Sequence, residues 1–184
     1  MIVAVYGSAA PAPGNPLYQT ALELGQLLAH AGYTVMTGGY GGTMEAVSRG
    51  AAEAGGTTLG ITCAEIEQHR PGSANLWVQQ EVHTQTLLER LEILTRQPDA
   101  MIALPGGVGT LCEISLALNR MVISSAPPKP FILIGTGWQQ TFQQFFTLNH
   151  EMISDLDQAR LQFALSPSEA VACLQKSLLG INHG

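Results

Sequence analysis

The chain has 184 residues, of which 46% are hydrophobic and only 12% are charged. This composition excludes a disordered chain and a coiled coil, because both need a larger share of polar or charged positions. The formal net charge is −6, and the eight Lys and Arg residues form no basic cluster. Since binding to a nucleic-acid backbone requires several neighbouring cations, we expect no polymer of DNA or RNA as a partner.

The cysteines and the N-terminal segment indicate the cellular setting. Cys63, Cys112 and Cys173 lie far apart without a CxxC spacing, which favours a reducing compartment over a disulfide framework or a zinc site. The histidines share no metal-ligand spacing. No secretory signal opens the chain, and no apolar run is long enough for a membrane span. We therefore expect a cytoplasmic protein without a metal or a membrane partner.

Short apolar segments alternate with longer segments of helical periodicity along the whole chain. The expected strands, bounded by Gly or Pro, are Ile2–Tyr6, Thr34–Thr37, Thr58–Thr62, Met101–Leu104 and Phe131–Ile134. The expected helices are Leu17–Ala31, Thr43–Ala54, Glu81–Arg96, Thr110–Ile123, Trp138–Glu151 and Pro167–Leu178. Cys63–Leu76 is expected to be a long loop. This alternation predicts one α/β domain over residues 1–184, with a Rossmann-like, doubly wound parallel sheet flanked by helices.

Unusual loops follow three of the expected strands, at the sheet edge where ligands bind in such folds. They read Gly7-Ser8-Ala9-Ala10, Gly38-Gly39-Tyr40-Gly41-Gly42-Thr43 and Pro105-Gly106-Gly107-Val108-Gly109-Thr110. Glycine lets an anion approach the backbone amides closely, and a following helix adds the positive end of its dipole. The two longer loops therefore favour a phosphate-binding site, with tight turns that hold no ligand as the alternative.

The familiar phosphate-binding motifs are absent. A P-loop needs a lysine after its last glycine, and none follows these loops. The dinucleotide fingerprint GxGxxG lacks its third glycine twice, where Met44 and Cys112 stand instead. A nicotinamide or flavin dehydrogenase and a nucleoside triphosphatase are thus disfavoured.

Two charged side chains are candidates for chemistry. Glu113 follows the last glycine loop within one helical turn, either as a functional carboxylate or as half of a capping box with Thr110. Ser166 and Glu169 form a similar pattern without a glycine loop, which predicts a purely structural cap. Arg90 lies on the margin of an apolar stripe, either as an anion clamp or with its head in water.

Together these residues resemble the LOG family of nucleoside 5′-monophosphate phosphoribohydrolases, once labelled lysine decarboxylases. The family signature PGGxGTxxE is matched by residues 105–113, and Val5-Tyr6-Gly7-Ser8 is similar to its first strand and turn. Residues 38–44 resemble its second glycine-rich loop, and Arg90 falls where its Met-x-x-Arg-Lys helix has the arginine. In that helix Leu87 and Leu91 stand in place of the methionine and the lysine.

The resemblance implies a Rossmann-like fold, a homodimer or higher homo-oligomer, and hydrolysis of the N-glycosidic bond of a nucleoside monophosphate, of the AMP or cytokinin type. Arg90 and Glu113 would be the catalytic pair, without a metal or redox cofactor. The residues implied in substrate and phosphate binding are Gly7, Ser8, Gly38, Gly39, Gly41, Gly42, Met44, Gly106, Gly107, Gly109 and Thr110.

Other activities stay open at this point. Related chains of this fold carry the phosphate-bearing molybdenum cofactor, so a carrier of a phosphorylated or oxyanion ligand is the main alternative. A nucleotide-sensing module is a third possibility. A lysine decarboxylase is disfavoured, because a pyridoxal Schiff base needs a well-placed lysine and neither Lys129 nor Lys176 is one.

Overall fold

The structure is a computed structural model that describes residues 1–69, 72–125 and 127–181. Its described strands form one parallel sheet in the order β4-β3-β2-β1-β5-β6-β7. The strands are β1 (Ile2–Tyr6), β2 (Thr34–Thr37), β3 (Thr58–Cys63), β4 (Gln80–Thr84), β5 (Ala100–Ala103), β6 (Phe131–Ile134) and β7 (Gln162–Ala164). The predicted fold class is confirmed.

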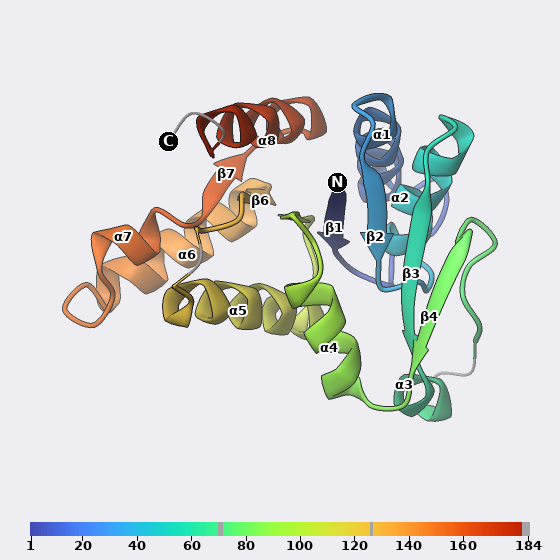
Figure 1. Cartoon of the computed structure of the whole chain (residues 1–184), viewed down its shortest axis with the longest axis horizontal. Helices are drawn as coiled ribbons and strands as arrows, with labels where there is room; N and C mark the ends of the chain where they lie inside the picture. The colour runs from blue at the N-terminus through green and yellow to red at the C-terminus, as the bar shows by residue number, and fades with distance from the viewer. Residues whose placement is uncertain (70–71, 126, 182–184) are drawn as a thin grey trace.

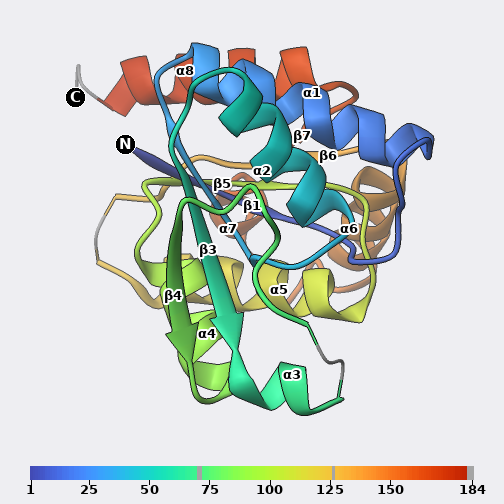
Figure 2. The same ribbon diagram turned by 90° about the vertical axis from the view of Figure 1, so that its right-hand side faces the viewer.

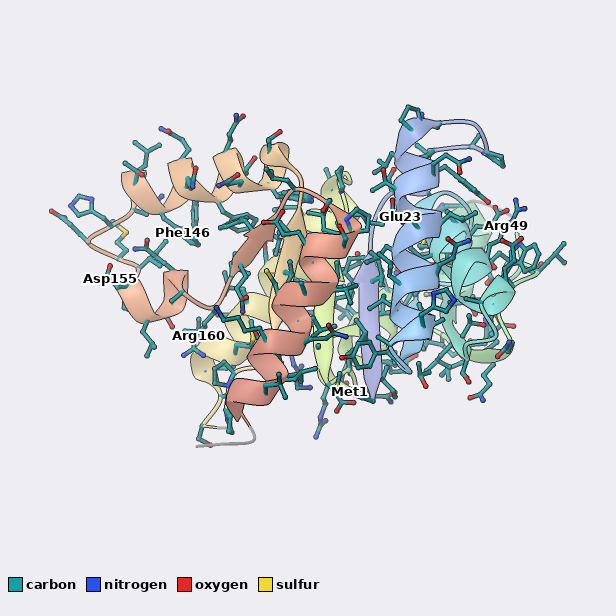
Figure 3. The ribbon with its side chains drawn as sticks, turned by 90° about the horizontal axis from the view of Figure 1, so that it is seen from above. Met1, Glu23, Arg49, Phe146, Asp155 and Arg160 are labelled. Carbon is teal, nitrogen blue, oxygen red and sulfur yellow. The ribbon has the colours of Figure 1, made fainter. Side chains whose placement is uncertain are left out.

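Helices cover both faces of this sheet. They are α1 (Pro16–His30), α2 (Thr43–Glu53), α3 (Ala64–His69), α4 (Leu87–Arg96), α5 (Val108–Ile123), α6 (Thr136–Leu148), α7 (Asp155–Gln158) and α8 (Pro167–Ile181). Figures 1 and 2 show α1, α2 and α8 on one side of the strands and α4 and α5 on the other. Figure 3 looks onto the first face, where α8 and α1 lie side by side. None of the helices in the described ranges is long and apolar enough to cross a membrane.

Each face of the sheet has its own apolar core, because successive side chains of a strand point to opposite sides. Val3 and Val5 of β1 pack in the core beneath α1, α2 and α8. Ala4 and Tyr6 pack in the second core, with side chains of α4, α5 and α6. The continuous apolar runs of the central strands are therefore explained by burial on both faces.

Helices α1 and α2 pack almost backbone to backbone. A Cβ atom added to Gly25 would lie 2.1 Å from the carbonyl oxygen of Val47, and one added to Gly50 would lie 2.0 Å from that of Leu22. Glycine at these two positions lets the helices approach closely. This packing fixes α2, and with it the glycine-rich loop that precedes it.

Two sequence-based predictions of local structure are wrong. Glu81–Arg96 is not one helix: its first part belongs to edge strand β4, and α4 begins only at Leu87, after a capping box of Thr86 and Glu89. The loop expected over Cys63–Leu76 contains α3. In addition, the short elements α7 and β7 were not expected. Strand β4 has mostly exposed side chains, so it lacks the apolar run that marks a buried strand.

The strand order places a topological switch at the centre of the sheet. The chain builds β1 to β4 in one direction, then returns to β5 on the other side of β1 and continues outwards to β7. The loops after β1 and β5 therefore leave the sheet in opposite directions, which opens the crevice where ligands bind in open α/β sheets.

Candidate functional site

The three glycine-rich loops meet, because β2, β1 and β5 are neighbours and all end at the same edge. The first two loops are joined by Thr43, whose backbone N–H and hydroxyl both donate to the carbonyl oxygen of Ser8, at 2.8 and 3.1 Å. Gly42 adopts a φ of +70°, and a Cβ atom there would lie 2.3 Å from the same oxygen. Only glycine permits this close approach of the two loops.

The third loop presents an open helix N-terminus. Gly107 caps α5 without a side-chain hydrogen bond, and Gly106, Gly107 and Gly109 are all exposed. The first turn of α5 contains no acidic residue, whereas Glu45 occupies the first turn of α2. A carboxylate already at the N-terminus of α2 disfavours a second anion there. The N-terminus of α5 is thus more favourable for an anion than the N-terminus of α2.

Arg90 and Glu113 are brought together from neighbouring helices α4 and α5. The guanidinium of Arg90 donates from Nε to the carbonyl oxygen of Ile61 at 2.7 Å, and from Nη2 to that of Gly38 at 3.0 Å. Its Nη1 lies 3.7 Å from Oε1 of Glu113. Both side chains are buried. Two carbonyl oxygens therefore hold Arg90 in place while its third nitrogen faces the carboxyl group.

Burial raises the pKa of Glu113 to about 7, and the nearby charge of Arg90 lowers it by less. Tyr6 lies in the core beneath this site, where burial and the Glu113 charge keep its pKa well above the usual value. Its hydroxyl donates to the carbonyl oxygen of Leu94 at 2.8 Å. Glu113 is thus a carboxyl group that exchanges a proton near neutral pH, as a general acid or base must.

A cavity of about 280 Å³ lies beside this pair. Its wall is formed by both charged residues together with Gly109 and mainly apolar side chains of α3, α4 and α5, namely Ile66, His69, Leu87, Leu91 and Cys112. Such a mixture of apolar walls and a few polar groups is typical of small-molecule sites. A second cavity, of about 340 Å³, lies between Pro105-Gly106 and the start of α6.

The structure decides two alternatives that the sequence left open. The head of Arg90 does not reach into water but is buried among backbone carbonyls. Thr110 and Glu113 form no capping box, because α5 begins at Val108 and Glu113 points to Arg90 from the second turn. At the start of α8, by contrast, Ser166 accepts from the backbone N–H of Glu169 at 3.2 Å, as a structural cap should.

The predicted binding residues divide into two groups. Gly106, Gly107, Gly109 and Thr110 surround the N-terminus of α5, where a Cβ atom on Gly106 would lie 2.2 Å from Oγ1 of Thr110. The others are less exposed: Gly38, Gly39, Gly42 and Met44 are buried, and Gly7, Ser8 and Gly41 are partly buried.

The sequence did not indicate some residues of the site. Ile66 and His69 were missed because their helix α3 was expected to be loop. The anchoring carbonyl of Ile61 carries no sequence signal, since every residue has a carbonyl group. Tyr40 belongs to the second glycine-rich loop, but nothing in the sequence indicates its partner. Its ring lies over the guanidinium of Arg90, 5.6 Å from ring centroid to Cζ.

The opposite end of the sheet holds a larger cavity of about 410 Å³, lined by Arg96, Arg120 and Lys129 among apolar side chains. Lys129 donates there to the carbonyl oxygens of Arg96 and Pro98, at the C-terminal end of α4. These cations complement helix C-termini, which carry partial negative charge. Within the described ranges, no group of three or more His, Cys, Asp and Glu is arranged to hold a metal ion.

Comparison with known proteins places the chain in a family. A family model described as the SLOG cluster4 family matches residues 1–162. A curated relative from Mycobacterium tuberculosis, named cytokinin riboside 5′-monophosphate phosphoribohydrolase, is 36% identical over 118 residues. That match spans 61% of this chain and 59% of the relative.

Solved structures resemble the chain over nearly its whole length. The molybdenum cofactor binding protein from Rippkaea orientalis is 29% identical, with a TM-score of 0.74 and coverage of 97% of this chain and 96% of that one. The molybdenum cofactor carrier protein from Chlamydomonas reinhardtii is 27% identical, with a TM-score of 0.73 and coverage of 97% and 98%. The match over 162 of 184 residues, on a fold shared with these structures, shows that the chain belongs to the SLOG cluster4 family.

Proposed function

We propose that the protein hydrolyses the N-glycosidic bond of a nucleoside 5′-monophosphate, of the AMP or cytokinin-riboside type, to a free base and ribose 5-phosphate. The observation that carries the proposal is the buried pair of Arg90 and Glu113, in which the carboxyl group has a pKa of about 7, beside a cavity and the open N-terminus of α5. The named phosphoribohydrolase relatives support the same reaction class.

The 5′-phosphate would bind the amides of Gly106 and Gly107 and the N-terminus of α5. Binding this remote group orients the ribose without taking part in the reaction. The apolar walls formed by Ile66, Leu87 and Leu91 would receive the base, which is flat and largely uncharged. A phosphate at one end and a base at the other would place the glycosidic bond near Glu113.

In the reaction, water attacks C1′ of the ribose as the bond from C1′ to the base nitrogen breaks, with its electron pair leaving on the base. Positive charge develops on the sugar, as in glycoside hydrolysis. The ionised carboxylate of Glu113 would stabilise this charge and accept a proton from the attacking water. The departing base would take up one proton from solvent, and Glu113 would return its proton to solvent. Arg90 would fix the carboxylate and neutralise the nucleotide's anionic groups.

The second candidate function is a carrier that binds a phosphorylated or oxyanion ligand without turnover. It is favoured by the solved structures described as molybdenum cofactor binding and carrier proteins, which cover 97% of this chain. The same N-terminus of α5 would hold the ligand's phosphate. In this case the buried carboxyl group of Glu113 would take part in no reaction.

Incubation with a panel of nucleoside monophosphates, followed by chromatography, separates the two functions. Hydrolysis predicts release of free base from at least one nucleotide, and Glu113→Gln should reduce the rate about a hundredfold or more. Arg90→Lys is the companion variant, since it keeps the charge but loses the two-carbonyl anchorage. No release from any nucleotide, together with ligand binding that Glu113→Gln leaves unchanged, would establish the carrier instead.

We also propose that the protein assembles as a homodimer or higher homo-oligomer through α4 and α5. Large apolar side chains are exposed on these two helices: Leu87, Leu88, Val108, Leu111, Val122 and Ile123. Where such side chains gather into one patch, they mark an interaction surface. Light scattering coupled to size-exclusion chromatography tests the proposal, and a purely monomeric protein at micromolar concentration would contradict it.

A further inference from the structure

Tyr40 connects Arg90 to a set of polar groups outside the cavity. The ring of Tyr40 lies over the guanidinium of Arg90, at 5.6 Å from centroid to Cζ. The ring belongs to the loop between β2 and α2, and the same loop supplies the carbonyl oxygen of Gly38 that accepts from Nη2 of Arg90. One loop thus contacts the guanidinium both at its edge and on its face.

The hydroxyl of Tyr40 is itself held in place. It accepts from the backbone N–H of Cys63 at 2.7 Å, and the carbonyl oxygen of Cys63 and Oε1 of Glu67 both lie 3.1 Å away as acceptors. Burial raises the pKa of Tyr40 to about 12, so the hydroxyl keeps its proton and donates to one of these two oxygens. The ring is therefore anchored at its far end to the last residue of β3 and to α3.

These contacts leave little freedom to the guanidinium. Its Nε and Nη2 are bound to carbonyl oxygens, Tyr40 covers one face, and Nη1 remains directed at Glu113, 3.7 Å away. A planar cation is attracted to the face of an aromatic ring and takes its orientation from it. The distance between Arg90 and Glu113 thus depends on a side chain that contacts Arg90 but does not itself line the cavity.

We propose that Tyr40 is a positioning residue, which orients the guanidinium of Arg90 toward Glu113 through its ring and is itself fixed through its hydroxyl by Cys63 and Glu67. This inference rests on the proposed function for its effect on catalysis. Its effect on the electrostatics of the site holds with or without turnover, because Arg90 and Glu113 face each other in the free protein.

The test compares Tyr40→Leu, which removes the ring, with Tyr40→Phe, which removes only the hydroxyl anchor. Tyr33, a partly buried tyrosine packed on the opposite core, supplies the control Tyr33→Leu. The first readout is the carbon-13 NMR titration of the Glu113 carboxyl group in the free protein. Because Arg90 lowers this pKa, its displacement in Tyr40→Leu should raise the pKa by about half a unit or more, with a smaller rise in Tyr40→Phe. The control should leave it unchanged.

The second readout is the kinetics of base release. Tyr40→Leu should lower kcat about tenfold or more with a smaller change in KM, because the residue orients a catalytic group and does not touch the substrate. A Glu113 titration that stays unchanged in both Tyr40 variants would overturn the proposal, and Tyr40→Phe alone decides it should Tyr40→Leu fail to fold. Absence of turnover in the unmodified protein would overturn the proposed function instead, and the titration would still decide the role of Tyr40.

Discussion

Nη1 of Arg90 lies 3.7 Å from Oε1 of Glu113, although the two residues come from different helices and both are buried. This distance is longer than the N–O distance in a hydrogen-bonded ion pair. Arg90 therefore stabilises the ionised form of Glu113 only in part, as the pKa of Glu113 shows. Desolvation raises it to about 7 in spite of the cation nearby. The carboxyl group of this pair can therefore gain or lose a proton near neutral pH, whereas in a hydrogen-bonded salt bridge it would stay ionised.

The raised pKa of Glu113 should make the protein less stable as the pH rises. Below pH 4.5 the carboxyl group is protonated in both the folded and unfolded states. Between pH 4.5 and about 7 the unfolded state ionises while the folded state keeps its proton, so folding loses about 3 kcal/mol over this range.

Urea denaturation at a series of pH values measures this loss. The free energy of unfolding of the unmodified protein, relative to that of Glu113→Gln, should fall from pH 5 to pH 8, because the amide does not titrate. The other carboxyl groups contribute equally to both proteins and cancel in this difference. A difference that is independent of pH would show that the carboxyl group is not desolvated as described.

A negative charge at the N-terminus of α5 should weaken binding at the proposed phosphate site. Val108 is the first residue of this helix and is 84% exposed, so a substitution there disturbs no packing within one subunit. Val108→Asp places a carboxylate beside the expected position of the phosphate, and the repulsion of about 1 to 4 kcal/mol should weaken AMP binding about fivefold or more. The neutral, similarly sized Val108→Asn is the control, and isothermal titration calorimetry measures both. Equal affinity of the two variants would place the phosphate elsewhere.

Gly38→Ala should displace the guanidinium of Arg90 and leave the backbone largely in place. A Cβ atom at this position would lie 1.9 Å from Nη2 of Arg90 and 2.6 Å from Sδ of Met44, and both atoms belong to side chains and not to the backbone. The guanidinium must shift, so we expect base release to slow about tenfold or more in a folded protein. Gly137→Ala is the matched control, since no described atom lies within 4 Å of its added Cβ. Equal rates for the two variants would contradict the role of Arg90.

The close approach of α1 and α2 predicts a loss of stability without a direct effect on the site. Gly25→Ala and Gly50→Ala each press a methyl group against a backbone carbonyl oxygen of the facing helix, which cannot move aside like a side chain. Overpacking of this kind costs about 1 to 3 kcal/mol. Chemical denaturation should show this decrease in the free energy of unfolding for both variants. A cost well below 1 kcal/mol would mean that the helices separate easily.

The central part of the fold could be predicted from the sequence because its signals are local. The strands at Ile2–Tyr6, Thr34–Thr37 and Phe131–Ile134 are continuous apolar runs, and the structure gives them the same bounds. The glycine-rich loops after β1, β2 and β5 also stand where the sequence placed them. Burial on both faces of a parallel sheet requires such runs, so the pattern and the structure agree.

The edge of the sheet and the chemistry of the site depend on contacts between distant residues. Strand β4 is mostly polar and exposed and pairs with β3 in a backbone ladder, so no apolar run in its own sequence marked it as a strand. Arg90 looked like an ordinary residue at the margin of an apolar stripe. Only the folded chain shows that carbonyl oxygens 29 and 52 residues away bind it.

The sequence by itself determined the α/β class, the glycine-rich loops and the candidate pair of Arg90 and Glu113, because residue type and spacing carry that information. The tertiary structure decided that this pair is buried, that Glu113 does not cap its own helix, and that Tyr40 covers the guanidinium. Desolvation is a property of the surrounding atoms, which come from separate segments of the chain, and no single segment of the sequence contains it.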